Sequence, residues 1–142
     1  MVITIICEDP PERTNRVELV PKQPDRFGTP GLRVTYKLHP NSKKLLNHGM
    51  ARARELMTTA GARKSYAFGP VRNTGWHIMG TARMGDDKTL SVVDSTGACH
   101  DVLGLSVVDA SVFVTGSCVN PANTIQAVAL HIADQIERRL LQ

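Results

Sequence analysis

A histidine lies in the glycine-rich stretch GWHIMGTARMG, residues 75–85. Three glycines among these eleven residues predict a tight, functionally shaped loop rather than a regular helix or strand. Because His77 stands between Trp76 and Ile78, we expect its ring to be partly desolvated. Desolvation disfavours the imidazolium, so such a histidine can act as a neutral base near about pH 7. The alternative is a histidine beside a tryptophan that has only a structural role.

Asp109, in the stretch VVDAS, ends an apolar run that is predicted to be a strand. In α/β folds ligands bind at the carboxyl ends of strands, where the carboxylate of Asp109 and the N–H group of Ala110 can meet a polar ligand. The alternative is that Asp109 only caps the following turn.

Asn120 and Pro121 precede an apolar run that is typical of a helix. Asparagine is a favoured N-cap and proline is well tolerated at the first helical position, so we predict that a helix begins here. A helix N-terminus presents unpaired N–H groups and a partial positive charge, which can hold an anion or an electron-rich oxygen. Asn120 is therefore either a cap alone or part of a site. The predicted core face of this helix comprises Ile125, Val128, Ala129, Ile132, Ile136 and Leu140.

The cysteines and the other histidines do not indicate a metal site. The three cysteines are odd in number and lack a CxxC spacing, so we expect free thiols in a reducing compartment, which favours the cytoplasm. The remaining histidines have no zinc-ligand spacing. The residues concerned are Cys7, Cys99, Cys118, His39, His48, His100 and His131.

The first 40 residues have the pattern of β structure. VITII is a short apolar run, and RVELV and LRVTYKL alternate on either side of the turn-rich PKQPDRFGTPG, which predicts neighbouring antiparallel strands with a long connection. HPNSKKLLNHGMARARELMTTAGA then predicts a helix that is capped by Asn41 or Ser42 and ends at Gly61. Residues 63–91 lose periodicity, and SVVD and GLSVVDASVFV predict short buried strands. Because those strands have no obvious partners in the chain, we expect a piece of a larger fold.

The composition narrows the class of protein. The 142 residues have the length of one ordinary domain, and 42% hydrophobic with 21% charged residues is typical of a soluble globular chain. The net charge of +4 is spread without a basic block, and aromatic residues are only 4%, which argues against nucleic-acid binding. No stretch approaches the roughly 18 apolar residues of a membrane span, and MVITIICEDP lacks the features of a signal peptide.

Taken in order, the motifs HxxGTxRMG, SVVD, LxVVDxSVFxT and VNPxxTIQAxALxxAD resemble the C-terminal signature of the glucose–methanol–choline (GMC) oxidoreductases. The signature covers roughly residues 75–136, and the stretch before it, with DRFG and a following strand and helix, is similar to the preceding part of the family. Within the family the sequence looks nearest to the bacterial sugar and polyol dehydrogenase-like branch.

The resemblance implies a role for each matching residue. His77 matches the active-site histidine that takes the hydroxyl proton while a hydride moves to N5 of FAD, and Asn120 matches a second active-site position that is His or Asn. Asp109 and Ala110 match the pair that contacts FAD. The start of the last helix, with Asn120, Pro121 and Thr124, matches the helix that faces the pyrimidine edge of the flavin.

The implied fold is α+β / α/β, as a fragment of a GMC oxidoreductase. Residues 1–74 would form part of the antiparallel substrate-binding domain, and residues 75–142 would carry the active-site loop and complete the FAD-binding domain. The sequence contains no G-x-G-x-x-G turn for the FAD pyrophosphate. We therefore expect that activity on an alcohol or sugar needs an N-terminal FAD-binding portion or a complementary chain, and any targeting signal would lie there. The alternative is a non-catalytic remnant that binds a protein partner through unpaired strand edges.

Overall fold

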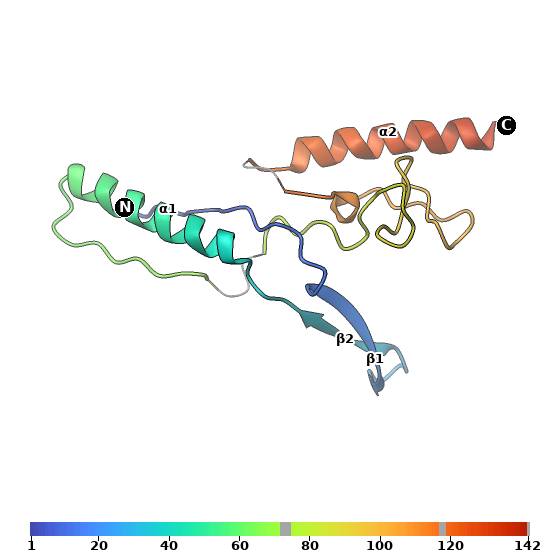
Figure 1. The fold of residues 1–142 in the computed structure, drawn as a ribbon, viewed down its shortest axis with the longest axis horizontal. Helices are drawn as coiled ribbons and strands as arrows, with labels where there is room; N and C mark the ends of the chain where they lie inside the picture. The colour runs from blue at the N-terminus through green and yellow to red at the C-terminus, as the bar shows by residue number, and fades with distance from the viewer. Residues whose placement is uncertain (72–74, 117–118, 142) are drawn as a thin grey trace. The chain divides into compact units, whose positions relative to one another are not determined.

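The computed structural model describes residues 1–71, 75–116 and 119–141 (Figure 1). It is a small α+β structure, as predicted. A two-stranded sheet and two helices are joined by long irregular segments, one of which contains a single turn of 3₁₀ helix. The elements are β1 Arg16–Pro24, β2 Pro30–Thr35, α1 Pro40–Thr59, the 3₁₀ helix η1 Ala110–Val112 and α2 Ala122–Leu140.

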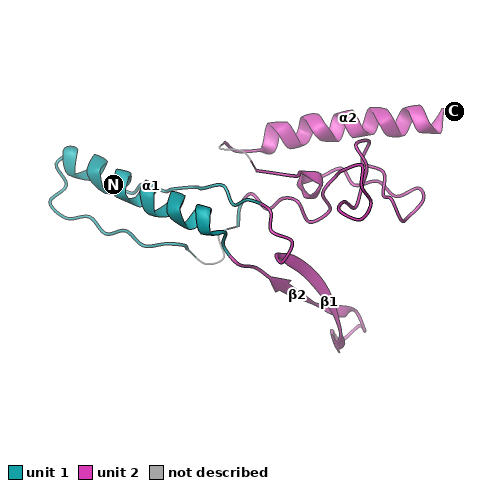
Figure 2. Cartoon of the chain, in the orientation of Figure 1, with its two compact units in different colours: residues 1–10, 38–76 teal, residues 11–37, 77–142 magenta. Residues whose placement is uncertain are grey.

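The chain divides into two compact units (Figure 2). Unit 1 consists of residues 1–10 and 38–76 and contains α1, and unit 2 consists of residues 11–37 and 77–142 and contains the sheet, η1 and α2. All of the predicted site residues belong to unit 2. The two domains expected from the sequence, residues 1–74 and 75–142, stay a prediction.

β1 and β2 form the antiparallel pair that the sequence predicts. β1 runs on as far as Pro24, so residues 25–29 alone form the connection, in which Asp25 Oδ1 accepts hydrogen bonds from the N–H groups of Phe27 and Thr29 at 2.8 and 2.9 Å. Cross-strand pairs give the hairpin two different faces. Val17, Leu19, Leu32 and Val34 share one face, and Arg16, Glu18, Arg33 and Thr35 share the other.

The prediction of a strand at VITII is wrong, because residues 2–6 have no strand structure. A strand needs a neighbour for its backbone N–H and C=O groups, and no described segment pairs with this one. The segment instead packs on α1, where a β-carbon at Gly49 would come within 2.7 Å of Ile5 Cγ2.

α1 begins two to three residues earlier than predicted. Its N-cap is His39, whose Nδ1 accepts a hydrogen bond from the Asn41 N–H at 3.1 Å, so neither Asn41 nor Ser42 is the cap. The reason is Pro40, which favours extended backbone in the residue before it and is accepted at the first helical position. Ser42 is buried and donates to Asp9 Oδ1 at 2.6 Å.

The end of α1 confirms the prediction for Gly61. Gly61 has φ +89°, the left-handed conformation that glycine adopts most readily. The Ala62 N–H bonds to the Met57 carbonyl and the Gly61 N–H bonds to the Thr58 carbonyl, both at 2.9 Å. This is a Schellman motif, which satisfies carbonyl groups that the helix leaves unpaired.

α2 confirms the predicted last helix but corrects its first residue. The Ile125 N–H bonds to the Pro121 carbonyl at 2.8 Å, so Pro121 is the N-cap and Asn120 lies one residue outside the helix. Ile132 on the predicted face is fully buried in a core with Val93 and Val112, and Val128 and Ile136 pack against it. Leu140, also predicted on this face, is 81% exposed.

The strands predicted at SVVD and GLSVVDASVFV are wrong. Those residues form only isolated bridges, Met84 with Val93, Val93 with Cys99 and Ala98 with Ser106, followed by η1. A short apolar run becomes a strand only where a neighbouring strand pairs with its backbone N–H and C=O groups. No strand among the described residues pairs with these segments in this way. Hydrogen bonds between loops hold this region in place instead.

Candidate active site

The loop that follows His77 is bound to the turn that follows Asp109. Three backbone N–H groups, from Gly80, Ala82 and Met84, donate to the carbonyl groups of Ala110, Ser111 and Val112 at 3.3, 3.0 and 2.8 Å. We call these three hydrogen bonds the loop ladder. Gly80 has φ +84°, a conformation that side chains with a β-carbon rarely adopt. The loop ladder brings together two of the three segments in which the sequence predicts site residues.

Asp109 lies at the start of η1, with its carboxylate exposed. Its Oδ1 accepts a hydrogen bond from the Ser111 N–H at 2.8 Å, so Asp109 does cap the following turn. Hydrogen bonds from the Ser111 hydroxyl and then from the Ser111 N–H lower the pKa of the carboxyl below its ordinary value. The group is therefore a carboxylate at neutral pH. The neighbouring Ala110 is half-buried, and its carbonyl oxygen accepts hydrogen bonds from the N–H groups of Gly80 and Phe113.

His77 is half-exposed, and its side chain makes no hydrogen bond within the described part of the chain. The half-buried state of His77 agrees with the partial desolvation expected from the sequence, although Trp76 is itself 68% exposed and Ile78 is 72% exposed. The structural alternative, in which His77 is a packed core residue, does not describe this chain. Among the described residues, then, nothing occupies the hydrogen-bonding nitrogens of the imidazole.

The predicted site residues at the start of α2 differ in their exposure to solvent. Asn120 and Thr124 are exposed, whereas Pro121 is buried. Pro121 provides no side-chain hydrogen bond at the N-cap, so the first turn of α2 has no side-chain cap. In residues 75–116 and 119–141 no hydrogen bond joins His77 to Asn120. Within the described residues, the structure thus links the loop after His77 to the turn after Asp109 but does not link His77 to Asn120.

A cluster that the sequence analysis did not single out lies at the end of the loop ladder. His100 Nε2 and Ser91 Oγ both approach the carbonyl oxygen of Gly85, at 3.0 and 2.9 Å. The spacing of the histidines in the sequence indicated only that His100 is not a zinc ligand. In the structure a β-carbon at Gly85 would come within 3.1 Å of Ser91 Cβ, a close approach that the sequence alone does not reveal.

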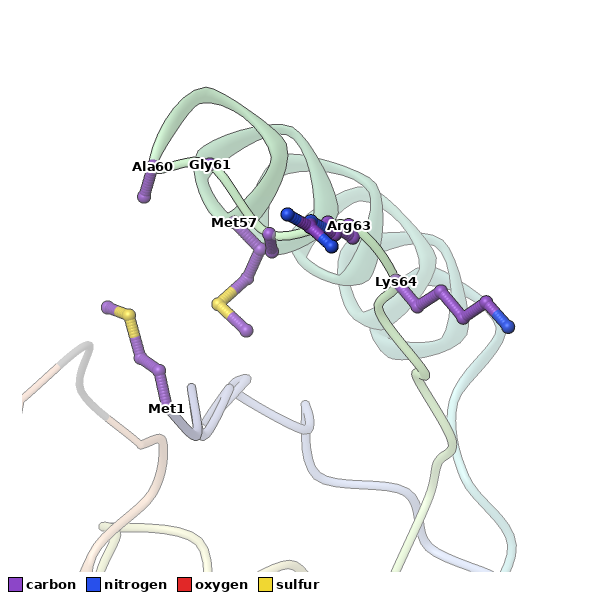
Figure 3. A pocket seen from close by; sticks show the side chains of 7 residues that line it. Met1, Met57, Ala60, Gly61, Arg63 and Lys64 are labelled. Carbon is purple, nitrogen blue, oxygen red and sulfur yellow. The ribbon is translucent and has the colours of Figure 1, made fainter.

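A hollow of ≈ 410 Å³ lies elsewhere, in unit 1, at the C-terminal end of α1 (Figure 3). None of the predicted site residues lines it. Figure 3 shows Met1 and Met57 pointing toward it, with Arg63 and Lys64 on the segment after the helix.

Among the described residues no group of three His, Cys, Asp or Glu side chains could hold a metal ion, and no helix is long and apolar enough to cross a membrane. Cys7 and Cys99 are free thiols, as predicted, and Cys118 lies outside the described residues.

Residues 11–129 match the sequence model of a family described as GMC oxidoreductase. The chain belongs to the GMC oxidoreductase family. It is 39% identical over 140 residues to 2-methyl-1,2-propanediol dehydrogenase of Mycolicibacterium austroafricanum, an alignment that covers 98% of this chain and 25% of the relative.

Two oxidases are also similar to the chain. Identity to 6'''-hydroxyparomomycin C oxidase of Streptomyces lividus is 34%, covering 97% of this chain and 25% of the relative. Identity to paromamine 6'-oxidase of Streptomyces fradiae is 32%, covering 94% and 25%. The chain therefore spans about a quarter of the length of these curated relatives. Both the family and the branch suggested by the sequence are confirmed.

Proposed function

We propose that this chain supplies the catalytic C-terminal portion of an FAD-dependent oxidoreductase that oxidises the CH–OH group of a polyol, sugar or similar alcohol. The observation that carries the proposal is the loop ladder, because its three hydrogen bonds join the loop after His77 to the turn that directly follows Asp109. The named activities of the relatives, a diol dehydrogenase and two oxidases, support the same class of reaction.

The described residues fit one side of a flavin site. Asp109 offers an exposed carboxylate, and the first turn of α2 offers a helix N-terminus without a side-chain cap. N–H groups at such a terminus, with the helix dipole behind them, stabilise negative charge on a bound ring. Pro121 and Thr124 would lie at this edge. The chain has no glycine-rich pyrophosphate turn, so the rest of the cofactor site would come from an N-terminal portion or a complementary chain.

FAD, when bound, supplies the hydride acceptor. The half-exposed imidazole of His77 would take the proton of the substrate hydroxyl as general base. The exposed amide of Asn120 would donate a hydrogen bond to the same oxygen and fix its direction. Because the structure joins neither residue to the other, their common target would be the substrate itself.

The competing hypothesis is a non-catalytic interaction module. The apolar face of the hairpin favours assembly with further protein, since Leu19 is 66% exposed and Val34 is 70% exposed. Assembly with an FAD-binding portion is part of the proposed function, so this surface fits both hypotheses. Substitution of His77 distinguishes the two hypotheses, because an oxidoreductase needs a general base at this position and an interaction module does not.

The test uses a chimera in which this chain replaces the matching quarter of the Mycolicibacterium dehydrogenase. His77→Ala should slow anaerobic flavin reduction by the diol about 10²–10⁴-fold, the usual contribution of a general acid–base group. The amount of bound flavin should stay the same, because His77 makes no hydrogen bond within the described residues. His131→Ala, at an exposed position on α2, is the matched control. An unchanged reduction rate per bound flavin would reject His77 as the base.

A further inference from the structure

Three half-buried residues, Gly85, Ser91 and His100, form a cluster at the end of the loop ladder. We call it the Gly85 clamp. His100 Nε2 lies 3.0 Å from the Gly85 carbonyl oxygen and 3.0 Å from Ser91 Oγ. Ser91 Oγ lies 2.9 Å from that same carbonyl oxygen and 2.7 Å from the carbonyl oxygen of Asp87.

The number of hydrogen-bond donors and acceptors in the clamp determines which ring nitrogen of neutral His100 carries the proton. A serine hydroxyl donates one hydrogen bond, and Ser91 faces two carbonyl oxygens that can only accept. The shorter contact, to the Asp87 carbonyl, is the better place for the hydroxyl proton. The Gly85 carbonyl then needs another donor, and His100 Nε2–H is within reach. The neutral ring is therefore the Nε2–H tautomer, whose proton is shared between the Gly85 oxygen and Ser91 Oγ.

The Gly85 clamp holds the segment that forms the loop ladder. Gly85 directly follows Met84, which donates the shortest bond of the ladder to Val112 at 2.8 Å. The Gly85 N–H is itself bound to the Val93 carbonyl at 2.9 Å, so the clamp fixes the other side of the same residue. Glycine at this position allows the approach of Ser91, which a β-carbon would obstruct.

We propose that His100 is a positioning residue, which through its Nε2–H and the Gly85 carbonyl keeps the His77 loop in register with Asp109–Val112. The effect on the loop follows from the hydrogen bonds alone. Its effect on alcohol oxidation rests on the proposed function. His100 touches neither His77 nor Asp109 through any hydrogen bond of the described residues, so it acts through the loop ladder.

The first measurement is the tautomer of His100 in the unmodified 142-residue chain. Nitrogen-15 chemical shifts at a pH where the ring is neutral should show a protonated Nε2 and a bare Nδ1. A bare Nε2 would overturn the proposal, because the Gly85 carbonyl would then receive no bond from His100. This measurement needs no variant.

The second measurement is amide hydrogen exchange in two nearly isosteric variants. Glutamine can place an N–H donor where His100 has Nε2, whereas methionine cannot. His100→Met should speed exchange of the Ala82 and Met84 amides roughly tenfold, the effect expected when a half-buried carbonyl loses its donor. His100→Gln should restore exchange to within about threefold of the parent, and α2 amides should not change in either variant. The same pair of substitutions at exposed His131 is the control.

Equal exchange at Ala82 and Met84 in the Gln and Met variants would contradict the proposal, as would equal acceleration of the α2 amides. Either result would make His100 an ordinary packing residue. In the chimera, His100→Met should also slow flavin reduction and His100→Gln should recover it. The exchange experiment involves no flavin, so a failure of the proposed function would leave its result intact, and the reverse also holds.

Discussion

Asn120 shows most clearly, at the scale of a single residue, how the structure changes an expectation. As an N-cap, Asn120 would have contributed stability that aspartate or serine could replace. The cap is Pro121 instead, and the Asn120 side chain is exposed without a hydrogen bond in the described part of the chain. Substitutions of Asn120 can therefore test its proposed catalytic role without removing a helix cap.

Asn120→Ala should change the free energy of unfolding of the chain by no more than about 0.5 kcal/mol, the range of ordinary surface substitutions. In the chimera it should slow flavin reduction, because the substrate oxygen loses a donor. Asn120→His should keep more turnover than Asn120→Asp, since the aspartate charge opposes the negative charge that a reduced ring gathers. Thermal unfolding and stopped-flow reduction of the three variants measure both effects. If Asn120→Asp reduces flavin at the rate of the parent, Asn120 has no part in the reaction.

At the scale of elements, the sequence predicted what depends on local pattern. The periodic apolar faces of α1 and α2 and the alternation in β1 and β2 identified four of the five elements, all except η1. The predicted start of α1 was wrong because Pro40 favours extended backbone in His39 and takes the first helical position itself. The predicted start of α2 was one residue early, because the Pro121 carbonyl accepts the first helical hydrogen bond, from the Ile125 N–H. The strands predicted at SVVD and GLSVVDASVFV were wrong because a strand depends on its neighbour, which local pattern does not reveal.

In the candidate site, too, part of the arrangement could be predicted from the sequence and part could not. His77, Asp109 and Asn120 were visible as residue types in motifs, and the structure shows that the loop ladder connects the first two segments. The Gly85 clamp was not predictable, because Ser91 and His100 meet only through the fold of the irregular segment between them. The roles in catalysis and flavin binding remain predictions that the experiments above address.

Gly97 decides how α2 packs on the irregular segment. A β-carbon at Gly97 would come within 2.7 Å of Ile132 Cγ2, and the residue has φ +74°. Gly104 has a similar φ of +76° but nothing within 4 Å of the added carbon. Gly104→Ala should therefore cost only the backbone strain, about 1–2 kcal/mol. Gly97→Ala adds overpacking and should cost about 2–5 kcal/mol in total.

Urea unfolding of both glycine variants, followed by the circular dichroism of the helices, gives the two costs. The difference between them isolates the contact between Gly97 and Ile132. Equal losses of stability would show that α2 does not pack closely on the turn at residue 97.

At the scale of the whole molecule, much of the apolar surface is uncovered. The hairpin presents Val17, Leu19, Leu32 and Val34 on one face, with exposed fractions between 49% and 70%. Only Val93, Val112 and Ile132 form a fully buried hydrophobic core among the described residues. A chain of this kind gains stability when more protein covers its faces.

The apolar hairpin face should bind a hydrophobic dye such as anilinonaphthalene sulfonate. The double substitution Leu19→Ser with Leu32→Ser should lower the dye fluorescence of the chain. The control is Glu18→Ser with Arg33→Ser on the opposite face, which should leave the fluorescence unchanged. In the chimera, the parent hairpin should bind little dye, because the rest of the protein covers it. Strong binding to the hairpin in the chimera would mean that this face has another partner.

The most direct test of the whole account is flavin reduction by an alcohol, measured under anaerobic conditions on the chimera and on the isolated chain. The chimera should be yellow, with a flavin absorbance band near about 450 nm. We expect 2-methyl-1,2-propanediol or a related polyol to bleach that band, whereas the isolated chain purified with excess FAD should stay colourless. A folded, flavin-containing chimera that no polyol or sugar bleaches would contradict the proposed reaction, and stoichiometric flavin on the isolated chain would contradict its dependence on a further FAD-binding portion.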